Sequence, residues 1–512
     1  MVELAGHGDQ KNLMLRLSKA MMRVRNLRGG AEQDNPDIPA GYTYLGQLIA
    51  HDLAFTDLSN LKFEARPAAP TTPASNALAA ATLDLGPLYG AGPDRAPQLY
   101  QRTGARLPRW KLRLSPMQQR ATGGPLQFPQ AIGDAMDLTR CPLVSGDPLA
   151  ITADARNDMH LLISQLMVLF AKFHNGLADH VEQGLEREAV LQGTTFDKRQ
   201  LFPQTRALVV AVYRRVVLDD FLARLCDPGI YKRTRDLINL YRHGPIPFPD
   251  RRARNVVPRA FASAAFRVGH VMARASYSLS VARTATVNGN GHVNADGPSL
   301  SSIFDQTGTR ISGANIQQNW DIEWDRFFFD TDGAYEVQTP DGRVRNFSHK
   351  ISPAAPTALV NKDRFGSDDE QQGGIIYLDL MRAFADELHD ADAIIPELAI
   401  NVPEASRLAS TERQAMLTRH FTVNGVQELS DSDIGKLSDQ TPLYLYTLLE
   451  AMAEPSGGTN LGPVGSTIVA GTITHALLDT IGETESARQR WDDLNISKPM
   501  PGTMPELLEF MT

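Results

Sequence analysis

Residues 154–175 read DARNDMHLLISQLMVLFAKFHN, and the second half of this stretch decides the fold class. From Leu161 to Phe173 apolar residues recur every three to four positions, which is the period of a helix with a buried face. The same period runs from Ala207 to Phe221. Both segments predict long, largely buried helices.

Four further segments show helical periodicity, whereas strand-like alternation is short and rare. They are residues 42–55, 260–275, 375–388 and 443–453. We therefore predict a mainly α protein, with a single large helical domain enclosing one site. Its expected limits are residues 41–485, between an N-terminal extension (residues 1–40) and a C-terminal tail (residues 486–512).

The composition bounds the class of protein. A chain of 512 residues with 42% hydrophobic content can enclose a sizeable core. The net charge is −8 and the basic residues are scattered, so no nucleic-acid partner is expected. Only two cysteines, Cys141 and Cys226, are present, which excludes a zinc or iron–sulfur site built from cysteine pairs.

The sequence shows no targeting or membrane segment. The first ten residues lack the basic and apolar regions of a secretory signal, so a cytoplasmic location is the default, although a mature chain that had lost its signal would look the same. The longest apolar stretches fall short of the roughly 20 residues that cross a bilayer. No membrane span is predicted.

Gln47 and His51 lie four residues apart in the predicted helix 42–55, which places both on one face, while Asp52 projects about 100° around the axis. One face is thus suited to chemistry and its neighbour to binding. By itself the pair His51 and Asp52 is more typical of a hydrogen-bonded core histidine beside a solvated charge.

Arg156 precedes the long helix that begins near Leu161. Cations are disfavoured at a helix N-terminus, so Arg156 points away from the dipole or is held by an acid or an anion. A surface pair with Asp154 or Asp158 explains it equally well. Yet glutamine, histidine and arginine together form a set that splits peroxide, because heterolysis needs a base, an acid and a stabilised leaving oxygen. Such chemistry requires a nearby metal.

A second histidine lies in residues 260–278, which read AFASAAFRVGHVMARASYS. Arg267 and His270 are three residues apart on one expected helical face, and Gly269 and the alanines would let a flat macrocycle approach the backbone. A neutral imidazole is a common axial ligand of haem iron. The alternative is close helix packing, with His270 bonded to a carbonyl.

Taken in order, these segments resemble the animal-type haem peroxidases of the peroxidase–cyclooxygenase superfamily, particularly their bacterial members. The resemblance spans roughly residues 40–480 and rests on an ordered set of motifs. They are Gly46-Gln47-x-x-x-His51-Asp52, Arg156 followed eighteen residues later by His174-Asn175, Phe266-Arg267-x-Gly269-His270, residues 83–90 (LDLGPLYG) and residues 461–465 (LGPVG).

The resemblance implies a role for each motif residue. His51 would be the distal acid–base residue, Arg156 the distal arginine, and Gln47 their partner, bonding water or halide above the iron. His270 would be the proximal iron ligand. Asn401 would accept the proximal imidazole N–H, although the sequence after it departs from the arginine-rich stretch usual in the family.

The haem attachment departs from the mammalian relatives. Those proteins form ester bonds from an aspartate before the distal histidine and a glutamate three residues after the distal arginine; here the positions hold Ala50 and Met159. Neither residue can form an ester, so non-covalently held haem b is expected. A link from Met159 to a vinyl group stays open, and Arg267 is grouped with His270, Asn401 and Met159 as cofactor-binding.

Calcium is the second cofactor that the resemblance suggests. Asp52 and Asp84 match the family's calcium aspartates, but Ala80, Thr82 and Gly86 replace its threonine, phenylalanine and serine. The backbone carbonyl of Thr82 could still contribute, although Ca²⁺ takes six to eight oxygens. The sequence leaves calcium open.

The implied activity is a haem-dependent peroxidase that uses hydrogen peroxide to oxidise bromide, iodide, thiocyanate or phenolic and aromatic donors through a ferryl intermediate. Two alternatives remain. A fatty-acid dioxygenase of the same fold has a tyrosine three residues before the proximal histidine, where this chain has Arg267. A non-catalytic haem-binding protein would not need the intact set of Gln47, His51 and Arg156.

Overall fold

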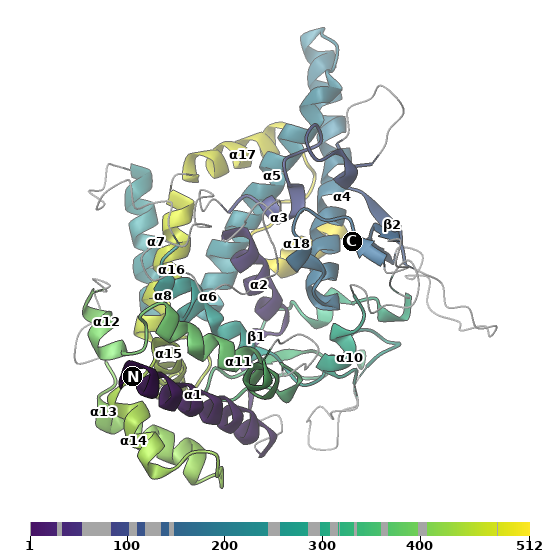
Figure 1. Ribbon diagram of the computed structural model, residues 1–512. Coiled ribbons are helices and arrows are strands. Elements are labelled where there is room, and N and C mark those ends of the chain that lie inside the picture. Colours follow the sequence, from purple (N-terminus) through teal and green to yellow (C-terminus); the bar gives the residue numbers. More distant parts are fainter. Residues whose placement is uncertain are drawn as a thin grey trace, which may run out of the picture.

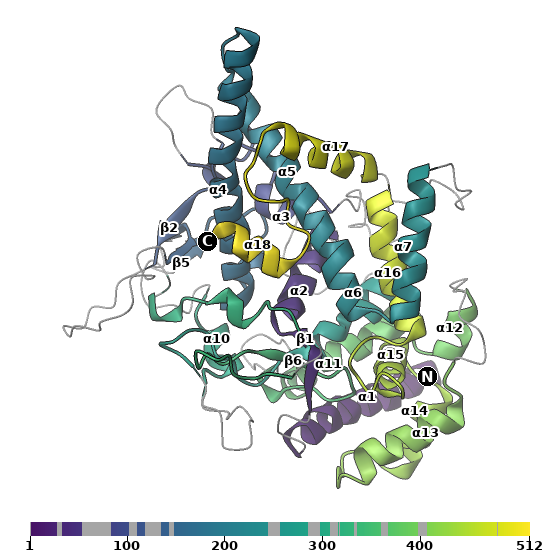
Figure 2. The ribbon, with the colours of Figure 1, turned by 180° about the vertical axis from the view of Figure 1, so that it is seen from behind.

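A computed structural model of the chain describes residues 2–27, 33–53, 83–101, 110–117, 135–142, 148–243, 257–284, 297–307, 316, 318–331, 335–359, 367–397, 407–478 and 480–512. The described residues form a mainly helical body, as predicted (Figure 1 and, from behind, Figure 2).

The α-helices are α1 (Val2–Leu27), α2 (Gly41–Leu53), α3 (Gly86–Tyr89), α4 (Leu161–Gln192), α5 (Leu201–Arg215), α6 (Leu222–Leu225), α7 (Pro228–His243), α8 (Arg259–Ala262), α9 (Gly269–Met272), α10 (Leu300–Phe304), α11 (Asp368–Ala385), α12 (Ala391–Glu397), α13 (Ser410–Leu417), α14 (Asp431–Asp439), α15 (Leu443–Met452), α16 (Pro463–Leu478), α17 (Ile481–Asp493) and α18 (Met504–Met511). Single turns of 3₁₀ or π-helix join several of them. The described strands pair antiparallel in twos: β1 (Asp34–Pro39) with β6 (Phe347–His349), β2 (Leu114–Pro116) with β3 (Met136–Leu138), and β4 (Arg140–Pro142) with β5 (Pro148–Ala150).

Helix α4 is the long helix that the sequence predicts, and its first half is buried almost without interruption. His160 caps its N-terminus by accepting the backbone N–H of Ile163, and Gly193 ends it in the left-handed conformation. By length and composition α4 is apolar enough to cross a membrane, but 83% of its apolar window is buried inside the protein. That burial is typical of a core helix.

The prediction for residues 207–221 is also confirmed, with one local difference. Helix α5 ends at Arg215, and residues Val216–Phe221 continue it as a turn of π-helix. This turn places Phe221 against α2, where a side chain on Gly46 would bring its Cβ to 3.2 Å from the Phe221 ring. Because Gly46 has no side chain, α2 can pack closely against the Phe221 ring at the position next to Gln47.

Helix α2 is anchored at its N-terminal end. The N–H of Gly41 donates to the carbonyl of Phe327, and a Cβ at this position would lie 2.6 Å from that oxygen. The Tyr42 hydroxyl donates to Asp220, which also accepts the backbone N–H of Met504. Segments from both ends of the chain therefore meet at one carboxylate.

The terminal segments pack against the central helices. In the two views α1 lies at the opposite end of the molecule from the projecting tip of α4, and it packs along α11 (Figures 1 and 2). Helix α17 packs on α5 and α18 contacts α4, burying Trp491, Met504 and Leu507. The domain limits expected from the sequence remain predictions, but residues 486–512 belong to the packed body.

Residues 260–275 differ from the single helix that the sequence predicts. They form α8, a 3₁₀ turn (Ala265–Val268) and α9 in succession. The reason is a competing hydrogen bond: the guanidinium Nε of Arg267 donates to the carbonyl of Ala262, at 2.7 Å. With this side-chain bond and the non-helical backbone of Ala264, the α-helical ladder is interrupted just before His270.

A buried ion cluster joins the small strands to the entrance of α4. Arg140 donates to Asp137 and forms two parallel hydrogen bonds with Asp158, at 2.7 and 2.8 Å. The side chains of Arg140 and Asp137 are fully buried. The cluster therefore fixes the turn that carries Arg156 and Asn157.

Replacing Arg140 by methionine should destabilise the protein by about 3–5 kcal/mol, because two buried carboxylates lose their cation. Urea unfolding followed by circular dichroism measures this change. Arg199→Met is the matched control, because its pair with Asp197 is exposed, and it should leave the midpoint unchanged. Equal midpoints for the two variants would contradict the assigned role of the cluster.

Candidate active site

His51 lies on the buried side of α2, with 8% of its surface exposed. Its Nδ1 is 2.8 Å from Oδ1 of Asn157. The Asn157 Nδ2 donates to the carbonyl of Pro87, so the amide oxygen faces the imidazole and accepts a hydrogen bond from its Nδ1–H. This arrangement leaves the Nε2 of His51 as the basic nitrogen, and Nε2 bonds to no described residue.

The electrostatic surroundings keep His51 neutral. Burial lowers the pKa of its imidazole to about 4, and the Arg156 guanidinium adds to that effect. A neutral imidazole with its Nδ1 proton bound elsewhere is a base at Nε2.

Arg156 is held beside His51 in two ways. Its Nη2 donates to the backbone carbonyl of His51 at 2.9 Å, and its Nε and Nη2 both contact the buried carboxylate of Asp154. From the sequence, a pair with Asp154 was an alternative to a catalytic role for Arg156. The structure shows that pair, and it also brings Arg156 into contact with the predicted catalytic histidine.

Gln47 is fixed by a residue that the sequence did not assign to the site. The Nδ1 of His160 accepts the N–H of Ile163, so its Nε2 carries the proton and donates to Oε1 of Gln47 at 2.9 Å. His160 is 5% exposed. It therefore links the start of α4 to the face of α2 that carries His51.

His270, at the start of α9, bonds to Asp379 of α11. The imidazole Nδ1 lies 2.5 Å from Oδ2 of Asp379, whereas Nε2 bonds to no described residue. The His270 side chain is 27% exposed, but Asp379 is fully buried. Although burial raises the pKa of the Asp379 carboxyl, His270, Arg267 and Arg382 together hold it below its ordinary value.

Arg267, like His270, lies close to the Asp379 carboxylate. Its Nε, bonded to Ala262, is also 3.8 Å from Oδ1 of Asp379. Asn401, the partner of His270 that the family resemblance implies, falls outside the residues that the structure describes. Within them, the partner of the proximal histidine is Asp379.

The two histidines fit a haem iron. Each is anchored through Nδ1 to an oxygen acceptor, and each has an Nε2 that bonds to no described residue. The helices that carry them are in contact, and Gly269 of α9 lies beside the Thr43 carbonyl of α2. His270 would hold the metal and His51 would face it, since a fixed Nδ1–H orients a ligating imidazole.

The two aspartates that the resemblance assigns to calcium both accept hydrogen bonds from neighbouring groups. Asp52 accepts the backbone N–H groups of Leu85 and Gly86, and Asp84 accepts the latter N–H and one from the Arg206 guanidinium. Burial raises the pKa of the Asp52 carboxyl, and the nearby Asp84 carboxylate adds to this effect, so that the pKa is about 7. Thr82 lies outside the described part of the chain, which contains no metal-binding group of three or more His, Cys, Asp or Glu side chains.

The residues between Arg156 and α4 offer no ester-forming group. Met159 is 45% exposed at the end of the 3₁₀ turn (Ala155–Asp158), and Asp158 is paired with Arg140.

His174 and Asn175, which complete the motif that begins with Arg156, have a structural role. Buried His174 lies between the Tyr89 hydroxyl and the Trp110 carbonyl. The Asn175 side chain bonds to both the N–H and the carbonyl of Leu112.

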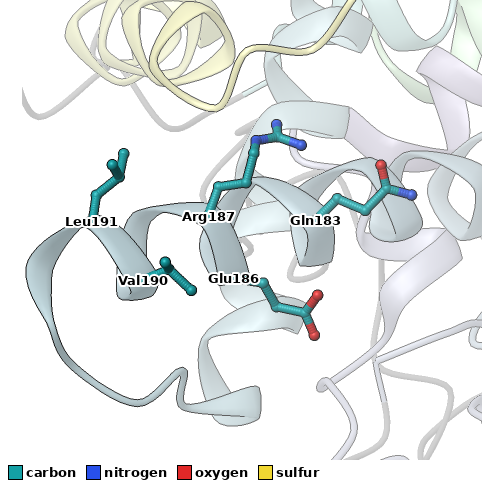
Figure 3. A pocket seen from close by; sticks show the side chains of 5 residues that line it. All are labelled: Gln183, Glu186, Arg187, Val190 and Leu191. Atoms are coloured by element: carbon teal, nitrogen blue, oxygen red, sulfur yellow. The ribbon is translucent and has the colours of Figure 1, made fainter.

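A surface pocket of about 500 Å³ lies at the far end of α4 (Figure 3). Its lining comes from that helix alone and contains no histidine: Gln183, Glu186, Arg187, Val190 and Leu191. At 1.5 Å per residue this pocket begins roughly 35 Å along α4 from His160. It is separate from the candidate active site.

Three residues that bond to the predicted set were missed: Asn157, His160 and Asp379. Asn157 directly follows Arg156 and His160 directly follows Met159, so their position in the turn was the available signal. Asp379 stands in the apolar run IIYLDLM of residues 375–381. A lone carboxylate in a predicted core helix requires a buried partner, and that requirement would have pointed to it.

The family model of the animal haem peroxidase matches residues 65–317, which include Arg156 and His270. Among solved structures the chain resembles peroxidase A from Dictyostelium discoideum, with 13% identity and a TM-score of 0.52 over 97% of this chain and 88% of that one. It also resembles a fatty acid alpha-dioxygenase from Oryza sativa, with 12% identity and a TM-score of 0.48 over 97% and 79%. A search of curated proteins finds no match.

The family match defines the class: the protein is an oxidoreductase of the kind that uses haem. Residues 65–317 match the animal haem peroxidase family, and the likeness to the Dictyostelium structure agrees with that fold.

Proposed function

We propose that the protein uses hydrogen peroxide to oxidise bromide, iodide, thiocyanate or phenolic and aromatic donors. The observation that carries the proposal is the arrangement of the two histidines, each fixed through Nδ1 and each with an Nε2 available for chemistry. Arg156 bonds to the backbone of one of them. The family match supplies the cofactor class, and these contacts supply the residues.

The haem, when bound, supplies the iron that receives peroxide and stores its oxidising equivalents. The chain's own residues move the proton. The Nε2 of His51 accepts a proton from the peroxide oxygen near the metal and returns it to the departing oxygen, so that water leaves. The guanidinium of Arg156 stabilises negative charge on that oxygen, and Gln47 orients the small molecules beside it.

The haem is proposed to be held without covalent bonds. Ala50 and Met159 occupy the ester positions of the mammalian relatives, and the nearby Asp158 carboxylate is engaged by Arg140 on both oxygens. A haem without ester links should be a weaker oxidant than that of chloride-oxidising relatives. Chloride is therefore not expected to be a substrate at neutral pH.

The purified protein should show a haem Soret band that changes when hydrogen peroxide is added. In His51→Ala the band should remain, but the rate of the spectral change should fall by about 10²–10⁴-fold, because the base is lost. The His270→Ala variant should bind haem more weakly than the wild type, because the proposed iron ligand is missing. Stopped-flow absorbance measures both effects.

His180→Ala is the control, because this histidine lies in the second half of α4 against Phe510, remote from the site. A wild-type protein without a Soret band would overturn the proposal of haem binding. A Soret band that does not respond to peroxide would instead favour the non-catalytic haem-binding alternative.

The rate of the peroxide reaction should depend on the protonation of His51. Since the pKa of its imidazole is lowered to about 4, the neutral form predominates above that value, and the rate should stay level from pH 7 to pH 5. It should fall as the pH drops through about 4. A midpoint near the ordinary histidine value of about 6.5, measured by stopped flow, would contradict this assignment.

We also propose that the protein works without calcium at Asp52 and Asp84, because hydrogen-bond donors occupy the oxygens of both carboxylates. Treatment with EDTA should therefore leave the Soret band and the thermal midpoint unchanged. Stoichiometric calcium in the purified protein, lost together with stability on chelation, would overturn this expectation.

A further inference from the structure

The residue that bonds to His270 is a carboxylate carried by a different helix. Asp379 lies in α11, which bends at Gly374, where the backbone takes φ 60° and ψ −155°. The bend is packed from outside, since a Cβ on the adjacent Gly373 would lie 2.8 Å from the Ser18 hydroxyl of α1. Close packing of α1 and α11 therefore fixes the segment that presents Asp379 to α9.

The two oxygens of Asp379 have different surroundings. Oδ2 takes the bond from His270, and Oδ1 has no hydrogen-bond donor among the described residues. Instead, Oδ1 faces Nε of Arg267 at 3.8 Å and Nη1 of Arg382 at 3.6 Å. Within the described residues the carboxylate is thus fully buried, hydrogen-bonded to the imidazole alone, and partly balanced by two guanidinium groups that do not hydrogen-bond to it.

We infer that Asp379 is a positioning residue that makes His270 a strongly electron-donating ligand and stabilises the ferric state of the bound iron. This inference rests on the proposed function, in which His270 holds the haem iron. An acceptor of the Nδ1 proton raises the basicity of the opposite nitrogen, and a carboxylate does so more than a neutral amide because it carries charge. Among the described residues the partner of the His270 Nδ1 is this carboxylate, and Asn401 lies outside them.

The neighbouring guanidinium groups set the strength of this effect. The positive charges of Arg267 and Arg382 lie close to the buried Asp379 carboxylate. They stabilise its negative charge, so the carboxylate raises the basicity of the imidazole less than it would alone. Arg382 is the more accessible of the two, with 42% of its side chain exposed. It can be replaced without leaving a fully buried gap.

The test compares reduction potentials of the haem-loaded variants by spectroelectrochemistry. Asp379→Asn keeps the shape and the acceptor but removes the charge, so the ferric-to-ferrous ratio at a given potential should fall about tenfold, equivalent to a rise of about 59 mV for one electron. The iron–histidine stretching frequency of the ferrous protein, read by resonance Raman, should fall. Asp368→Asn, an exposed position on the same helix, is the matched control.

Arg382→Gln should move the potential in the opposite direction, because the carboxylate then loses a counter-charge. If Asp379→Asn retains haem and its potential and stretching frequency match those of Asp368→Asn, the inference is wrong. If instead His270→Ala leaves the haem bound with an unchanged spectrum, the proposed function fails at its ligand. The two failures are therefore distinguishable.

Discussion

The site depends on one constraint, which is that polar side chains taken into the interior must be paired. The turn from Asp154 to His160 enters the core just before α4, and four of its polar side chains are almost fully buried. Asp154 pairs with Arg156, Asn157 with His51, Asp158 with Arg140, and His160 with Gln47. Satisfying these groups fixes the turn in several directions and thereby places both Arg156 and the imidazole of His51.

The same principle operates on the opposite side, where a helix from later in the chain supplies the partner. His270 sits after a broken stretch of helix, so its orientation is not set by a regular helical ladder. A buried carboxylate on α11 fixes it instead. Asn157 and Asp379 are thus comparable: each accepts the hydrogen bond from Nδ1 of one histidine and leaves its Nε2 without a described partner.

Much of this could be read from the sequence because apolar periodicity is a local property. It predicted α2, α4, α5, α11 and α15, and it placed Gln47 and His51 on one face. Pairing between distant segments is not local, so the sequence could mark Asp379 as a buried carboxylate but could not show that it bonds to His270. The break before His270 also escaped prediction, because it arises from the Arg267 side chain bonding to a carbonyl rather than from a residue that breaks helices.

Asp220 accepts hydrogen bonds from the Tyr42 hydroxyl of α2 and from the backbone N–H of Met504, which begins α18. A ribosome makes the chain from its N-terminal end, so α2 is synthesised more than 450 residues before Met504. The helix that carries His51 therefore acquires this anchor only after the segment that contains Met504 has been synthesised. The N-terminal end of α2 is in this sense secured long after the helix itself has been made.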